Sequence, residues 1–205
     1  MNSWNHITGF QLEVLREIGN IGAGNAASSL ATLLNKKVEM AVPKAGVMDF
    51  KEIFSLVGNE EEIVACINFN VSGKAPGKIL FLLDESSTYQ LVDMLLGRGI
   101  GTTKELDEIG QSTVKEIGNI LTGSFITAFS EFTRLDFIGS VPAFAFDMLG
   151  AVLSAAFLEG GYFDERVLII ETTFYEEEVS INGHFFFVPA TGSMETIFEA
   201  LGLNV

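Results

Sequence analysis

The chain has 205 residues, of which 48% are apolar, so it is long enough to bury one sizeable core or two small ones. Asp and Glu outnumber Lys and Arg by 27 to 12, and the net charge of -15 argues against nucleic acid and anionic membranes as partners. No apolar run nears the roughly 18–20 residues of a membrane-spanning helix, and the chain begins polar, so we expect a cytoplasmic protein without membrane insertion.

Hydrophobic periodicity and turn residues predict the same order of elements in each half of the chain. In the first half, a long helix, a strand, a short helix, two strands and a last helix are expected at 8–35, 37–42, 49–57, 63–71, 78–83 and 85–96. In the second half, the corresponding elements are expected at 104–134, 135–141, 147–158, 167–175, 184–188 and 192–201. Asn182-Gly183 predicts a hairpin turn.

Mixed helices and strands in each half indicate the α+β class, in the form of an α/β sandwich. The glycine-dense segment 97–101 separates an internal repeat, 1–100 and 101–205, within one domain. An insertion of about seven residues is expected near 159–162 in the second half. Two halves of this size are expected to pair about a pseudo-twofold axis and to share a sheet.

The repeat is most visible in one pentapeptide, Glu-Ile-Gly-Asn-Ile, which occurs unchanged at 17–21 and 116–120. Matching positions follow in both copies: Gly24 and Gly123, then Pro43 and Pro142. Because the halves have otherwise diverged widely, a polar pair kept in both copies indicates function more than packing. The alternative, an ordinary solvated helix face preserved passively by duplication, remains open.

A helical wheel separates the polar pair from the expected core. The side predicted to be buried carries Val14, Leu15, Ile18, Ile21 and Leu33, and the opposite stripe carries Glu13, Glu17, Asn20, Gly24 and Ala31. The second copy has Ser112, Glu116, Asn119, Gly123 and Ser130 on the equivalent stripe. Since glycine weakens a helix, Gly19 and Gly118 suggest that something approaches closely there.

A carboxylate and an amide can position a water molecule, but they contain no nucleophile and no metal-ligand set. Such a pair suits insertion into a site that already holds a phosphoryl group, where an amide can orient the attacking water. The only cysteine, Cys66, lies in an apolar run typical of a buried structural thiol. No metal site is predicted, although a metal hydrolase that uses Glu13 and Glu17 is one alternative.

The pattern Asp/Ser-x3-Glu-x2-Asn, followed after 22 residues by Pro, resembles the signature of the CheC/CheX/FliY phosphatases of bacterial chemotaxis. Ser112, Glu116, Asn119 and Pro142 fit it fully, whereas Glu13 stands where the first copy would have Asp or Ser. Two copies about 100 residues apart match the two-site members of the family, and the resemblance covers the whole chain.

The resemblance implies dephosphorylation of the phosphorylated response regulator CheY. The regulator would carry the aspartyl phosphate and Mg²⁺, and this chain would have no cofactor of its own. Asn20 or Asn119 would orient the water, and Glu17 or Glu116 would pair with a lysine of the regulator. The family also implies a second partner, the receptor deamidase CheD.

The predicted helix 147–158 is apolar around most of its circumference, so it is either buried or covered by a partner. If it is a docking surface, the CheD-binding candidates are Asp147, Met148, Leu149 and Val152. Rival functions are a non-catalytic interaction module of the flagellar switch, as in FliM, or a regulator of the CheD deamidase.

Overall fold

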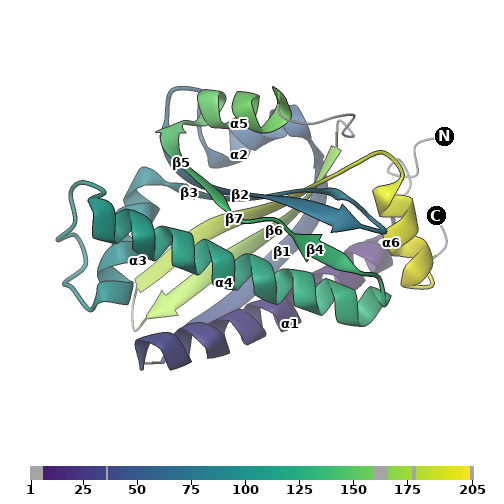
Figure 1. The fold of residues 1–205 in the computed structure, drawn as a ribbon, viewed down its shortest axis with the longest axis horizontal. Coiled ribbons are helices and arrows are strands. Elements are labelled where there is room, and N and C mark those ends of the chain that lie inside the picture. The colour runs from purple at the N-terminus through teal and green to yellow at the C-terminus, as the bar shows by residue number, and fades with distance from the viewer. Residues whose placement is uncertain (1–6, 36, 159–165, 177–178, 204–205) are drawn as a thin grey trace.

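The computed structural model describes residues 7–35, 37–158, 166–176 and 179–203 as three layers, with helices on both faces of one sheet (Figure 1). The helices are α1 (Gly9–Leu34), η2 (Phe50–Glu52), α2 (Ile53–Val57), α3 (Glu85–Leu96), α4 (Glu108–Thr133), α5 (Leu149–Leu158) and α6 (Ser193–Ala200). The strands are β1 (Glu39–Asp49), β2 (Ile63–Gly73), β3 (Gly77–Asp84), β4 (Phe137–Gly139), β5 (Ala143–Met148), β6 (Arg166–Glu176) and β7 (Val179–Pro189). The predicted α+β class is confirmed.

Within the described residues the sheet has seven strands in the order β1-β6-β7-β3-β2-β4, with β5 also paired to β2, and these neighbouring strands are antiparallel. Strand β1 from the first half pairs with β6 from the second, while β4 and β5 from the second half pair with β2 from the first. The halves therefore share one sheet, as predicted, and each contributes an outer strand beside the other half.

Two buried cores lie on the two faces of the sheet. The larger core packs α1, α3, α4 and α6 against one face, and Leu15, Leu121 and Phe198 are fully or almost fully buried in it. The smaller core packs α2 and α5 against the other face around Ile53, Leu153 and Phe186. In Figure 1 the long helices α1 and α4 lie side by side below the sheet, and α2 and α5 lie above it.

Local capping sets the bounds of both long helices. The Thr8 hydroxyl accepts from the Gln11 backbone N–H, and the Gln11 side chain accepts from the Thr8 N–H, which forms a capping box at the start of α1. Asp107 caps α4 by accepting from the Gly110 N–H at 2.7 Å, so α4 begins four residues later than predicted. Both helices end at a residue in the left-handed conformation, Asn35 and Arg134.

The prediction that the first strand of the first half ends at residue 42, before Pro43, is wrong. Strand β1 continues to Asp49, because its register with β6 shifts between Ala41 and Lys44 and this irregularity accommodates Pro43, which has no N–H to donate. In the second half β4 is short, and β5 forms after Pro142 by pairing with β2. Pairing over long sequence distances decides both strands.

The predicted turn at Asn182-Gly183 is also wrong. Both residues lie inside β7, where Asn182 is paired with Thr173 and Gly183 with Thr172. A side chain at Gly183 would place its Cβ 2.7 Å from the Phe81 ring, so the glycine makes room for core packing rather than for a turn. The predicted insertion near 159–162 lies outside the described residues.

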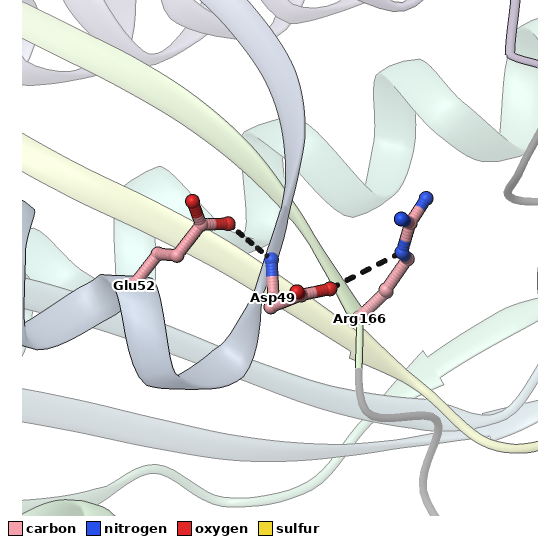
Figure 2. Close-up of polar contacts among 3 residues, drawn as sticks. All are labelled: Asp49, Glu52 and Arg166. Carbon is pink, nitrogen blue, oxygen red and sulfur yellow. Dashed lines mark hydrogen bonds and ion pairs between the residues drawn. The ribbon is translucent and has the colours of Figure 1, made fainter.

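At the far end of β1, the ion pair between Asp49 and Arg166 joins the two halves. Arg166 Nε lies 3.2 Å from Asp49 Oδ1, and the Asp49 backbone N–H donates to Glu52 Oε2 at 2.7 Å (Figure 2). This arrangement fixes the passage from β1 into η2 above the sheet. In the described part of the chain, no helix has both the length and the apolar character needed to cross a bilayer.

Candidate functional site

The first Glu-x-x-Asn pair lies at the surface of α1, with Asn20 close to strand β1 of the sheet. Glu13, Glu17 and Gly24 are exposed, as the wheel predicts, whereas Asn20 is half-buried. Ile18, one position from Glu17, is buried in the core on the opposite side. The wheel fails further along the helix.

Leu33, which the wheel assigns to the core, is instead 58% exposed. Beyond the middle of α1, the surface that faces the core follows the packing of α4 as well as the sheet, so a single wheel does not describe the whole helix.

The two glycines inside the pentapeptide face the sheet rather than a partner. A Cβ at Gly19 would lie 3.3 Å from Ile170 Cγ2, and a Cβ at Gly118 would lie 2.6 Å from Ile67 Cγ1. The predicted close approach is therefore made by strands β6 and β2. A Cβ at the exposed Gly24 or Gly123 would meet nothing within 4 Å, so packing within the chain does not require glycine at these two positions.

The Asn20 side chain is held in one orientation by the strand that follows its helix. The backbone N–H of Val42 donates to Asn20 Oδ1 at 3.1 Å, and Val42 directly precedes Pro43. Since a backbone N–H needs an acceptor, the amide oxygen points to β1 and the amide NH₂ is directed elsewhere. Asn20 and its matched Pro43 are therefore close in space, because Asn20 binds the residue directly before the proline.

The second pair is more open than the first. Ser112, Glu116, Asn119 and Gly123 are all exposed along α4, and Pro142 is half-buried between β4 and β5. Val141 is 88% exposed, whereas the corresponding Val42 is buried. Within the described residues, no hydrogen bond holds the Asn119 amide, so both its oxygen and its NH₂ face solvent.

Helices α1 and α4 pack antiparallel, which separates the two pairs. The middle of each helix meets the other, because a Cβ at Gly22 would lie 2.8 Å from the Phe125 ring. The pairs consequently lie toward opposite ends of the helix pair. A groove of about 480 Å³ runs beside Ser112 and Glu116, and its apolar lining includes Leu33 and Ile109.

The chemistry of the described residues provides no complete active site of its own. Burial raises the pKa of the Cys66 thiol to about 12, although the nearby Lys78 ammonium lowers it in part, so Cys66 is not a thiolate nucleophile near neutral pH. Among the described residues, no three His, Cys, Asp or Glu side chains converge as metal ligands, and one carboxylate with one amide at each pair does not fit a Mg²⁺ site. The pairs can orient water and bind a cationic group.

The structure revises the docking surface expected on α5. Asp147 and Met148 are exposed just before the helix, but Leu149 and Val152 are buried in the smaller core and are not available to a partner. The exposed side of α5 carries small residues, among them Ala151. Beside it lies a groove of about 370 Å³ whose lining includes Glu60 and Glu61.

Sequence reasoning missed a basic residue directly before the Glu of each Glu-x-x-Asn pair. Arg16 precedes Glu17 and Lys115 precedes Glu116, at the same spacing as the rest of the repeat. Arg16 forms an ion pair with Glu13, with Arg16 Nη2 2.5 Å from Glu13 Oε2, and Lys115 Nζ lies 5.3 Å from the centre of the Phe144 ring. The signal was present in the sequence, since the repeated segment extends one residue further as a basic position.

Known proteins share both the sequence pattern and the fold. The CheC-like family matches residues 2–47 and 109–145, the two segments that carry the Glu-x-x-Asn pairs. The chain is 34% identical over its whole length to the CheY-P phosphatase CheC of Bacillus subtilis (strain 168), and the match also spans all of that protein.

Two solved structures show the same fold. The crystal structure of Thermotoga maritima FliY matches with a TM-score of 0.74 at 23% identity, over 96% of this chain and 98% of that chain. The FliM middle domain from H. pylori matches with a TM-score of 0.66 at 15% identity, over 95% of this chain and 99% of that chain. The chain therefore shares its fold with FliY and its sequence, over the whole length, with a CheC. It belongs to the CheC-like family, which confirms the resemblance seen in its sequence.

Proposed function

We propose that this chain is a phosphatase that removes the phosphoryl group from an aspartyl phosphate on the response regulator CheY. The observation that carries the proposal is the placement of both Glu-x-x-Asn pairs at the surface of long helices, with Asn20 oriented by the residue directly before its matched proline. The full-length relative named a CheY-P phosphatase supports the same reaction.

In this reaction the chain contributes positioning rather than a nucleophile. The amide of Asn20 or Asn119 holds a water in line with the phosphorus, the water oxygen forms the new P–O bond, and the bond to the regulator's aspartate oxygen breaks. The products are inorganic phosphate and the free aspartate. Glu17 or Glu116 pairs with a lysine of the regulator and thereby fixes how the two proteins dock.

The metal that such a reaction uses belongs to the regulator in this proposal. Mg²⁺ supplies charge stabilisation at the phosphoryl oxygens when it is bound there. The pairs of this chain do not fit a Mg²⁺ site, so their role is to complete a site that the partner carries. We place the reaction in the cytoplasm and treat residues 1–205 as one domain with an internal repeat.

The test is phosphate release from phosphorylated CheY with Asn20→Ala, Asn119→Ala, Glu17→Gln and Glu116→Gln. Each Asn variant should lower kcat because water placement acts in the chemical step, and each Glu variant should mainly raise KM because docking weakens. Asn59→Ala, which changes an exposed Asn in the loop between α2 and β2 on the other face of the sheet, is the matched control. Wild-type kinetics in all four variants would contradict the proposal.

The rival function is a non-catalytic module of the flagellar switch, which the fold likeness to the FliM middle domain keeps in view. Both Glu-x-x-Asn pairs are intact and lie at the surface, and a purely structural module has no need of them. A chain that binds a switch component but leaves the lifetime of phosphorylated CheY unchanged would favour this rival.

We also propose that the deamidase CheD binds beside the start of α5. The two halves differ at this point. Asp49 is paired with Arg166 (Figure 2). The Asp147 carboxylate, within the described residues, accepts only from the neighbouring Met148 N–H. Asp147 and the exposed Met148 thus offer an acid beside an apolar contact. Asp147→Asn should weaken CheD binding in a titration, and Asp49→Asn is the matched control.

A further inference from the structure

Each long helix contains a single basic residue, and in both helices it occupies the same place in the repeat. Over Gly9–Leu34 the only Lys or Arg is Arg16, and over Glu108–Thr133 it is Lys115. The whole chain has only 12 such residues, so a basic position kept in both copies is a feature separate from the Glu-x-x-Asn pair.

Lys115 lies on the face of α4 that carries the second pair. It is three residues after Ser112 and four before Asn119, so the three side chains are neighbours on the helix surface. Its Nζ rests 5.3 Å from the centre of the Phe144 ring in β5, two residues beyond Pro142. Lys115 is exposed and, within the described part of the chain, forms no ion pair, so its charge is available at the pair.

Arg16 has the same place in the first copy, but its charge is compensated. Glu13, where the family pattern has Asp or Ser, lies 2.5 Å from the Arg16 guanidinium through Oε2 and Nη2. The second copy has Ser112 at the position of Glu13. The difference between Glu13 and Ser112 therefore leaves the cation neutralised in the first site and available in the second.

We propose that Lys115 is a positioning residue that attracts and orients the anionic phosphoryl pocket of the regulator at the second site, and that Glu13 masks the equivalent Arg16 at the first. This inference rests on the proposed phosphatase function. A phosphoryl group carries about -1.5 to -2 charges near neutral pH, which a lysine ammonium attracts. In a chain with a net charge of -15, a local cation at the docking point offsets general repulsion of an anionic partner.

The alternative role for Lys115 is packing, since an ammonium above an aromatic ring is stabilising in its own right. The two roles predict different kinetics. A docking charge changes KM and its dependence on salt, whereas a packing contact changes the stability of α4 and β5 and leaves both quantities alone.

The experiment measures kcat and KM for phosphate release from phosphorylated CheY at low and high salt. Lys115→Met should raise KM about five- to tenfold with little change in kcat, and the increase should shrink at high salt. Lys115→Arg should restore most of the loss. Lys51→Met removes one exposed charge from the opposite layer and is the matched control, with KM as in the wild type.

The masking half of the inference is tested by exchanging the two positions. Glu13→Ser in an Asn119→Ala background, where only the first site can act, should lower KM about threefold because Arg16 is released. Ser112→Glu in an Asn20→Ala background should raise KM as Lys115→Met does. If Lys115→Met and Lys51→Met behave alike while Asn119→Ala is impaired, this inference alone is overturned. If the Asn20→Ala/Asn119→Ala double variant keeps full turnover, the phosphatase proposal fails and the inference fails with it.

Discussion

The two sites carry the same pentapeptide but differ in what surrounds it. At the first site, Val42 orients a half-buried Asn20 and Glu13 neutralises Arg16. At the second site, Asn119 is exposed and Lys115 has no acidic partner within the described residues. The two copies therefore share the Glu and Asn side chains that would contact the partner, but they differ in the neighbouring residues that hold those side chains. The first site is the more preordered, and the second is the more open and less acidic.

The largest expected effect comes from disabling one site at a time. With the regulator well below saturation, Asn119→Ala should reduce phosphate release about tenfold and Asn20→Ala by only about a tenth, because the two sites act in parallel and docking at the less acidic second site dominates at low concentration. Steady-state phosphate release measures both. A larger loss for Asn20→Ala would show that the preordered amide outweighs the difference in charge.

Replacing the glycine inside the pentapeptide with alanine should destabilise the fold more in the second copy than in the first. Gly118→Ala should lower the free energy of unfolding by about 1–3 kcal/mol, because its Cβ would overlap Ile67, whereas the looser contact of Gly19→Ala is offset by the better helix propensity of alanine. Urea unfolding of the two variants tests this difference. Equal losses of unfolding free energy would mean that β2 and β6 accommodate the added methyl groups equally well.

A third comparison sets a buried acid at the junction between the halves, Asp93 on α3, against an exposed acid elsewhere, Glu199 on α6. Asp93 is fully buried, and its carboxylate accepts from the Thr102 N–H at 2.9 Å, the Thr103 N–H at 3.0 Å and the Thr103 hydroxyl at 2.6 Å, whereas Glu199 is exposed. Asp93→Asn should cost about 1–3 kcal/mol of unfolding free energy. The control, Glu199→Gln, should change it by less than about 0.5 kcal/mol.

The pH dependence of Asp93→Asn follows from the direction of its pKa. Burial raises the pKa of Asp93, but the hydrogen bonds from Thr103, Thr102 and Gly101 outweigh burial and leave it below the usual value. The ionised carboxylate therefore stabilises the fold above the ordinary Asp pKa of about 3.9, and this contribution is lost as the pH falls below that value toward the lowered pKa. Unfolding measured at pH 7 and at pH 3 should show the difference between wild type and variant narrowing in acid.

The smallest expected effect concerns the open glycines of the exposed stripe. Gly24→Ala and Gly123→Ala should each stabilise the fold by about 0.5–1 kcal/mol, because alanine favours the helix and the added methyl meets nothing within the chain. If a partner approaches there, the same methyl should reduce turnover at its own site. Thermal unfolding and phosphate release on the same variants sharpen the comparison, and higher stability with unchanged turnover would show that no partner needs the space.

Much of the fold was predictable where local chemistry decides it. The bounds of α3 agree with the predicted 85–96, because Asp84 caps it and Gly97 ends it in the left-handed conformation. The extension of β1 past Pro43, the formation of β5 and the position of Asn182 within β7 were not predictable, because partner strands far away in sequence determine them. Local conformational propensity depends on one segment of the chain, whereas strand pairing depends on two segments that are distant in sequence.

The candidate site divides in the same way. The repeat and the wheel located both Glu-x-x-Asn pairs, since an exposed helix face depends on spacing alone. The hydrogen bond from Val42 to Asn20 and the position of Lys115 over Phe144 could not be read from spacing, because each joins a helix to a strand more than twenty residues away. The burial of Leu149 and Val152 likewise follows from how α5 packs on the sheet.

The central claim is that the two amides together make this chain a phosphatase. The most direct measurement is the decay of phosphorylated CheY in a single turnover with excess wild-type chain, compared with the Asn20→Ala/Asn119→Ala double variant. We expect the wild type to accelerate the decay and the double variant to leave it at the regulator's own rate, at least about a hundredfold slower than with wild type. Acceleration by the double variant equal to that of the wild type would contradict the account.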